Sequence, residues 1–193
     1  MAGEARVRYS TVAIFFHWTI AILLIGQVAG GLFMVNIPDE EASLKLQVFQ
    51  LHKSFGVTIL LLSALRLLWR LINPAPPLPE TMAGWEKFAA RASHGLFYFM
   101  LFAIPLVGWA VVSASPLNLP TVLFGVVPWP HMPFFEGVAD RQALEDALAE
   151  VHEYLAFTTV GLLVLHIAAA LKHHFLDRDD VLARMLPLVK PKG

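Results

Sequence analysis

The sequence predicts an all-α membrane protein, a four-transmembrane-helix bundle with both termini in the cytoplasm. The 193 residues are 57 % apolar and 15 % charged, with a mean hydropathy of +0.63, whereas soluble domains carry about 25 % charged residues. Four apolar segments exceed the roughly 20 residues that cross a bilayer. Lys and Arg gather at one end of these segments. At this length the chain is expected to form one domain.

Composition also excludes several classes of function. The formal net charge is −1, so nothing indicates a nucleic-acid partner. The chain has no cysteine, which excludes disulfides, thiolate-bound iron–sulfur clusters and thiol catalysis. Any metal centre is therefore expected to use nitrogen ligands.

The first predicted span, residues 11–35, contains no Lys, Arg, Asp or Glu. It is too long for a signal-peptide core and has no convincing cleavage site, so we expect it to be retained. The second span, residues 46–72, is less apolar because it contains four ionisable side chains, namely His52, Lys53, Arg66 and Arg70. Ionisable groups inside a span are costly and are more often functional than accidental.

The third and fourth predicted spans cover residues 92–114 and 151–176. Between the second and third spans, the proline-rich segment 73–79 predicts a stiff, extended linker. Before the fourth span, segment 139–150 has helical spacing of its apolar residues and is expected to lie on the outer surface.

The basic residues predict the orientation. Eleven of the 14 Lys and Arg lie near the N-terminus, around the second connection or near the C-terminus. The positive-inside rule places these segments in the cytoplasm. The other two connections and the span ends beside them carry nine Asp and Glu against only three Lys and Arg, so the outer face is expected to be acidic.

Four histidines sort into two pairs by their depth in the membrane. His152 and His166 lie fourteen residues apart on the fourth span, which puts them within about 40° of one another and about 21 Å apart along one helix. With the predicted topology, His52 lies at the outer level of His152, and His17 lies at the inner level of His166. A lone histidine is more often hydrogen-bonded locally, but two level-matched pairs indicate metal ligands. A rival pairing joins His17 to His94.

Haem iron fits two imidazoles at each level, because haem takes axial histidines and bundle cores hold cofactors between facing helices. Zinc would require three or four close ligands. Two axial histidines leave no open position on the iron, so the expected chemistry is outer-sphere electron transfer. Gly31 and Gly56, near the outer level, predict either close approach of a flat macrocycle or ordinary helix packing.

The inner edge offers groups for haem propionates and for a quinone. Arg66 and Arg70 lie on the same helix face as His52 but closer to the cytoplasm, and are candidates to bind the propionates of an inner haem. The alternative is that they reach toward lipid headgroups. We favour this alternative for Arg70 but not for Arg66. The remaining candidates for a quinone or a propionate are His94, Lys172, His173 and His174. For the last two, interfacial anchoring is the alternative.

The chain resembles the bacterial cytochrome b561 family of di-haem membrane proteins. The matching motifs are FFHWTIAILL around His17, LHKSFGVTILLLSALRLLWRLINPAPP around His52, HGLFYFMLFAIPLVGWAVVSA in the third span and VHEYLAFTTVGLLVLHIAAALKHHF in the fourth, within residues 8–188. The resemblance implies two haem b groups in a bacterial inner membrane, one held by His17 and His166 and the other by His52 and His152. It also implies electron transfer from an outer-face donor to ubiquinone or another quinone, with superoxide as the donor of one member type.

Superoxide is an anion, and its capture would benefit from a positive funnel. The acidic outer face offers Lys53, beside His52, as its best local attractor. A neutral reductant or a basic protein donor suits this surface equally well. Two alternatives remain: a haem-bearing anchor or relay subunit for a dehydrogenase or hydrogenase-like partner, and a metal or proton transporter that uses the intramembrane histidines. The oligomeric state is left open.

Overall fold

The computed structural model describes residues 8–189, and its four long helices are each apolar enough to cross a membrane. They are α1 (Thr11–Val35), α2 (Ala42–Ile72), α3 (Gly84–Ala114) and α4 (Arg141–Lys172). The predicted all-α membrane bundle is therefore confirmed. The last three helices begin before the apolar segments predicted from the sequence, because their polar first turns are helical too.

The start of α4 corrects one expectation. Residues 139–150 were expected as a separate surface helix, but from Arg141 onward they form the first turns of α4. The Asp140 side chain accepts a hydrogen bond from the Ala143 amide at 3.0 Å, which is a standard N-cap. No helix-breaking residue separates this start from the apolar segment, so one continuous helix forms.

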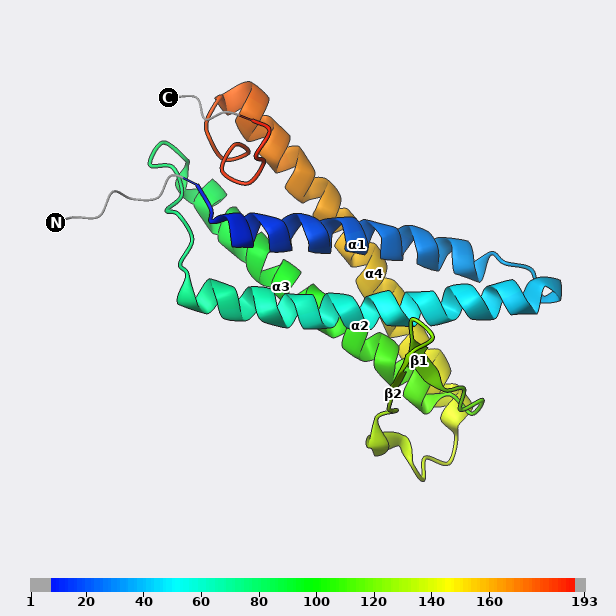
Figure 1. Ribbon diagram of the computed structural model, residues 1–193. Helices are drawn as coiled ribbons and strands as arrows, with labels where there is room; N and C mark the ends of the chain where they lie inside the picture. Colours follow the sequence, from blue (N-terminus) through cyan, green and yellow to red (C-terminus); the bar gives the residue numbers. More distant parts are fainter. Residues whose placement is uncertain (1–7, 190–193) are drawn as a thin grey trace.

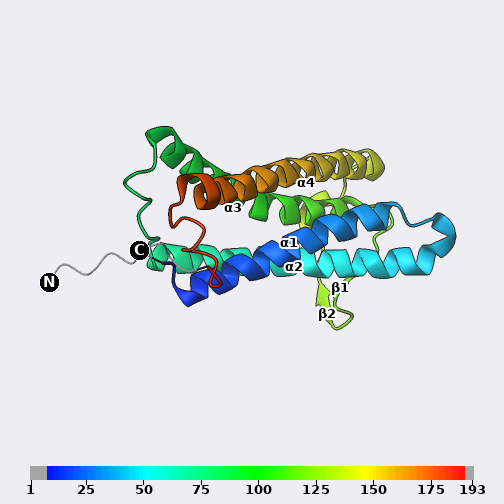
Figure 2. The ribbon, with the colours of Figure 1, turned by 90° about the horizontal axis from the view of Figure 1, so that it is seen from above.

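The helices form two antiparallel pairs, α1 with α2 and α3 with α4. The second pair lies obliquely across the first (Figure 1), and the view from above shows the pairs as two layers (Figure 2). Close backbone packing also joins α2 to α3, whereas within residues 8–189 neither α1 nor α2 packs closely on α4. Side chains therefore have to bridge the space between α4 and the first pair.

The packed interior is small, as expected for a bundle surrounded by lipid. Ile20, Ile59 and Leu101, from three different helices, form its apolar cluster. Ser54 and Thr159 are also fully buried, and each hydroxyl donates to the carbonyl four residues earlier, at 2.7 and 2.9 Å. Such small polar residues allow helices to approach closely without an unsatisfied group in the membrane.

Both described chain ends lie at the same end of the bundle (Figure 2). Arg8 donates to the carbonyls of Ala183 and Val189 at 3.0 and 2.9 Å, and the Trp18 indole donates to the Met185 carbonyl at 2.9 Å. We call this end, which also carries connection 73–83, the terminal end. The other end, with connections 36–41 and 115–140, is the opposite end.

Connection 115–140 contains a hairpin that the sequence analysis did not predict. Strands β1 (Thr121–Leu123) and β2 (Val127–Trp129) pair antiparallel. Their turn places Phe124 at φ 51° and Gly125 at φ 73°, a left-handed conformation that a phenylalanine rarely adopts. The Phe124 amide donates to Ser54 Oγ at 2.9 Å, and its ring meets that of Phe55 at 5.2 Å. Tertiary contacts with α2 thus hold a turn that the local sequence disfavours.

Candidate functional site

Two histidine pairs bridge α4 to the first helical pair. The ring centroids of His52 (α2) and His152 (α4) are 6.3 Å apart, and those of His17 (α1) and His166 (α4) are also 6.3 Å apart. A metal–imidazole bond is about 2 Å long, so two histidine rings that bind the same metal ion can lie about 6 Å apart. Both pairs therefore have a spacing at which two imidazoles would hold one metal ion.

The two pairs lie at different levels of the bundle. Fourteen residues separate His152 from His166 on α4, about 21 Å along the axis. On α1, Gly31 lies fourteen residues after His17, and a Cβ atom at Gly31 would be 3.3 Å from Cε1 of His52. Two helices thus independently place the His17 pair at one level and the His52 pair at the other.

His152 is held in the tautomer that a metal ligand needs. Its Nδ1 lies 3.1 Å from the Ile104 carbonyl of α3, which can only accept, so the ring proton is on Nδ1 and the Nε2 lone pair is available for a metal. One turn further along α3, a Cβ atom at Gly108 would be 2.9 Å from Cε1 of His152. The ring can lie against α3 because residue 108 is a glycine.

The contact of Gly108 with His152 was not predicted from the sequence. The only signal was a glycine in the third span at the level of His152. Gly56 was one of the glycines predicted to lie near the outer level. It lies beside Gln27, and a Cβ atom at Gly56 would be 3.5 Å from Nε2 of Gln27. The same amide donates to the His52 carbonyl at 2.8 Å, so Gly56 serves the packing of α1 on α2.

His52 carries a polar atom without a partner. Its Nδ1 is buried and has no hydrogen bond among the described residues. Leaving a buried donor or acceptor unpaired costs about 1–3 kcal/mol. Such a cost indicates a position kept for function rather than for the stability of the bundle.

The pair formed by His17 and His166 lies beside Arg66. Nη2 of Arg66 is 3.2 Å from Nδ1 of His17. A guanidinium can only donate, so Arg66 would have to turn away from this nitrogen for His17 to bind a metal through Nε2, because Nδ1 would then carry the ring proton. Arg66 also lies over the Tyr98 ring, 5.7 Å from its centroid. Within residues 8–189, neither Arg66 nor Arg70 forms an ion pair, although both are half-buried. They line a small cavity together with Arg8, Tyr9, Ser10 and Tyr98. A cavity with three guanidinium groups suits an anionic group.

His94 lies beside the same pair. Its ring centroid is 5.8 Å from that of His166, and Phe97 meets His166 edge-on at 5.2 Å. The His94 side chain is exposed on α3. The rings of His17 and His94 both contact the ring of His166. Among the described residues, the ring contacts include none between His17 and His94, so they do not favour the rival pairing of these two.

The terminal end of α4 holds a network of charged side chains. The Lys172 ammonium lies 2.7 Å from both Glu86 Oε1 and Asp177 Oδ2. Nδ1 of the buried His173 lies 2.7 Å from Asp179 Oδ2 and 3.1 Å from Asp177 Oδ2. Sequence reasoning found the lysine and the histidine but missed the carboxylates, which come from α3 and from beyond the end of α4. The neighbouring His174 stacks edge-on with Phe175 at 4.8 Å.

Lys53 is the basic residue closest in sequence to the His52 pair. Its ammonium lies 3.4 Å from the Pro120 carbonyl and 5.3 Å from the centre of the Phe49 ring. Lys45 pairs with Asp39 at 2.7 Å, and Arg141 donates to carbonyls at the end of α3. Lys45 thus has a carboxylate partner, and Arg141 caps the end of α3. Lys53 does neither in the part of the chain that the structure describes.

Paired histidines at two levels of a four-helix membrane bundle are the arrangement expected of a membrane cytochrome. Residues 8–188 match the family described as prokaryotic cytochrome b561, and the chain belongs to this family.

Relatives cover nearly the whole chain. "Cytochrome b561 homolog 2" of Escherichia coli (strain K12) is 38 % identical over 180 residues, 93 % of this chain and 91 % of the relative. "Cytochrome b561 homolog 1" of the same organism is 25 % identical over 93 % of this chain and 97 % of its own length. "Probable superoxide oxidase CybB" of Yersinia pestis is 28 % identical over 93 % of this chain and 96 % of its own length.

Membership defines the general character of the protein. It is a multi-pass membrane cytochrome with b-type haem, an oxidoreductase that transfers electrons in the membrane. The haem can be tested against the chain itself. The 6.3 Å imidazole pairs fit two ligands of one iron ion, and the unpartnered His52 Nδ1 lies in one of these pairs. The arginines that line the small cavity fit the carboxylates of a haem rather than its ring.

Replacing Gly108 tests the support of His152. Gly108→Val places a branched side chain where even a Cβ atom would be 2.9 Å from the His152 ring, so the ring must move and haem content should fall. The measurement is haem per protein by pyridine haemochromogen spectroscopy. Gly95→Val, on the same helix with nothing within 4 Å, is the matched control. Equal haem content in both variants would contradict this role of Gly108.

Proposed function

We propose that this chain carries electrons through two b-type haems, from a small donor at the opposite end to a quinone at the terminal end. The observation that supports the proposal best is the two histidine pairs. Within each pair the ring centroids are 6.3 Å apart, and the two pairs are separated by about 21 Å along α4. His52 and His152 would hold one haem, and His17 and His166 the other.

We further propose that the terminal end faces the cytoplasm of a bacterium and that the protein lies in its inner membrane. The basic residues that support this orientation lie at the terminal end of the predicted spans and in the flanking segments. The opposite end carries most of the acidic residues and would face the periplasm.

The chain's own residues position the haems and limit their chemistry. When bound, haem iron supplies one-electron oxidation and reduction. Two imidazoles per iron would leave no coordination position for oxygen, which favours electron transfer over oxygen activation. The Ile104 carbonyl orients His152. Arg66 and Arg70 would balance the carboxylates of the inner haem, since neither has an anionic partner in residues 8–189.

His94 and His173 are the residues we assign to the quinone. His94 touches the ring of His166 and is open to the surroundings of the bundle. His173 lies seven residues after His166, on the same helix face and about 10 Å closer to the terminal end. Reducing a quinone to a quinol takes two electrons and two protons. A histidine held by Asp179 at 2.7 Å could pass a proton to a quinone oxygen.

Superoxide is the donor that we propose, with the relative named probable superoxide oxidase CybB as support. Two superoxide anions would each give one electron and leave as molecular oxygen, while one quinone takes up two electrons and two protons. Lys53 supplies a positive charge beside His52 and has no ion pair within residues 8–189. Its ammonium could attract an anion toward an otherwise acidic surface.

Turnover by the purified holoprotein tests the function. With an enzymatic source of superoxide and a soluble ubiquinone analogue, we expect quinol formation, and Lys53→Gln should slow it more at low salt than at high salt because screening weakens attraction. Lys45→Gln, which removes a lysine already paired with Asp39, is the control. Intact haems without turnover would contradict the proposal and favour a relay subunit that receives electrons from a partner enzyme.

Two histidine variants test the pairing. His152→Ala should remove the haem at the opposite end, and His166→Ala the haem at the terminal end. Each variant should therefore retain about half of the haem, since the pairs are separated by about 21 Å. Haem per protein and low-temperature absorbance spectra are the measurements, with His131→Ala in the connecting loop as the control. Full occupancy in either variant would show that the pairing is wrong.

Arg66 is expected to raise the reduction potential of the inner haem. Its positive charge favours the reduced iron, so Arg66→Gln should lower that potential by about 60 mV, which corresponds to a tenfold change in a one-electron equilibrium. A redox titration followed by absorbance gives the value. Arg91→Gln, in the first part of α3, is the control. An unchanged potential would argue against a propionate partner at Arg66.

A further inference from the structure

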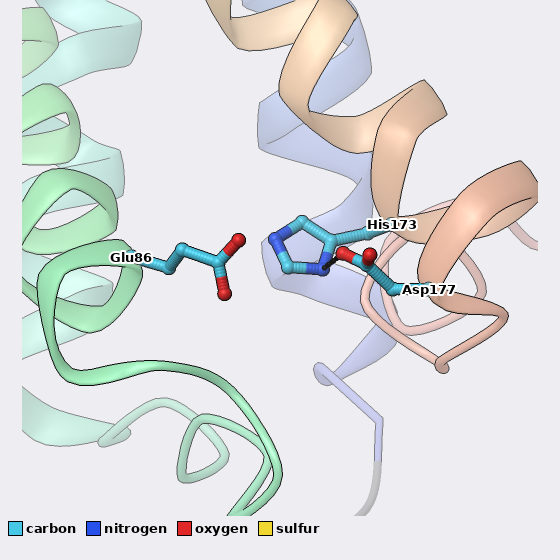
Figure 3. A group of neighbouring side chains, drawn as sticks. All are labelled: Glu86, His173 and Asp177. Carbon is cyan, nitrogen blue, oxygen red and sulfur yellow. Dashed lines mark ion pairs between the residues drawn. The ribbon is translucent and has the colours of Figure 1, made fainter.

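We propose that Glu86, His173 and Asp177 form a binding site for a divalent transition-metal ion of the zinc type. The site lies where the start of α3 faces the end of α4 (Figure 3), seven residues after His166 at its nearest point along the chain. One ligating atom from each residue lies within 4.8 Å of the other two.

The three side chains form a ligand set suited to zinc. Imidazole and carboxylate groups are common zinc ligands. Glu86 comes from the first turn of α3, whereas His173 and Asp177 bound a π-helical turn, η3 (His173–Asp177), that continues α4. Single π-helical turns are rare and occur frequently at functional sites. His173 and Asp177 are four residues apart, a spacing that places two side chains on the same face of a helix.

His173 is already oriented as a ligand. Asp179 Oδ2 holds its Nδ1 at 2.7 Å, and Figure 3 shows the other ring nitrogen directed toward the Glu86 carboxylate. Asp177 Oδ2 also lies on the Nδ1 side, at 3.1 Å, so its side chain has to turn away from Nδ1 to reach an ion held between Glu86 and the other ring nitrogen. This is the carboxylate–histidine–metal arrangement of zinc sites, in which the outer carboxylate fixes the ring and raises its basicity. With only 8 % of its surface exposed, His173 has little freedom to turn away.

The Lys172 ammonium already occupies the place of a cation. It lies 2.7 Å from a carboxylate oxygen of Glu86 and 2.7 Å from one of Asp177. Together with Asp179, the cluster has three carboxylates and one lysine, so negative charge is in excess. The Lys172 side chain is 40 % exposed and that of Asp177 33 %. A metal ion can therefore enter from solvent as the lysine turns outward.

Metal binding at this place would affect quinone reduction. The ion would engage His173, so zinc should slow the transfer of electrons to the quinone and leave haem reduction by the donor unchanged. This consequence rests on the proposed function, because it uses the assignment of His173 to the quinone. The metal site itself does not depend on that assignment.

A zinc titration of the purified holoprotein against a chromophoric chelator tests the site directly. We expect one Zn²⁺ per chain at this site. Glu86→Gln and Asp179→Asn should each weaken binding about 10- to 100-fold, as loss of a ligand or its outer partner does elsewhere. Lys172→Met should tighten binding, because it removes the competing ammonium. Asp146→Asn, an acidic residue near the start of α4 and outside the cluster, should leave the affinity unchanged.

The opposite signs of these effects protect the test from misfolding, since a damaged protein would not bind zinc more tightly. Unaltered haem spectra in each variant provide a second check. Equal affinity in wild type, Glu86→Gln and Lys172→Met would overturn the metal site. Quinone reduction with and without zinc then tests the consequence. Zinc that binds without slowing it would overturn the role of His173 at the quinone and leave the metal site standing.

Discussion

Inside a membrane, every polar group has to find a partner within the protein or its cofactor, and most of this structure follows from that constraint. Ser54 and Thr159 satisfy it within their own helices. His152 satisfies it with a carbonyl of α3. Some groups of the described chain do not satisfy it. Nδ1 of His52 and Oγ of Ser63 are buried on α2 without a hydrogen bond, and the half-buried Arg66 and Arg70 have no ion pair within residues 8–189.

The same constraint explains the open arrangement of the bundle. α4 packs closely on α3 but not on α1 or α2, and its two histidines reach across that spacing to His17 and His52. A bundle packed tightly on all sides would have no room for a macrocycle between its helices. Weak direct packing between α4 and the first helical pair is what the proposed haem sites would require.

The two ends of the bundle differ in chemistry. At the terminal end, carboxylates from both α3 and the segment after α4 surround Lys172 and His173, which joins the helices and offers proton-carrying groups. At the opposite end, a hairpin covers α2 beside Ser54, and Lys53 contacts the start of that hairpin. The opposite end thus presents a lysine without an ion pair within residues 8–189, and the terminal end presents a network of carboxylates, a lysine and a histidine.

The sequence by itself determined the four helices, the two levels and the members of each histidine pair, because helix rise and periodicity are local properties that residue spacing reveals. The tertiary structure alone decided what supports each site. Ile104 and Gly108 meet His152 across nearly fifty residues, and Glu86 meets Lys172 across 86. The hairpin depends on Ser54 and Phe55, about 70 residues away. Such contacts arise from how helices pack, and no spacing along one helix specifies them.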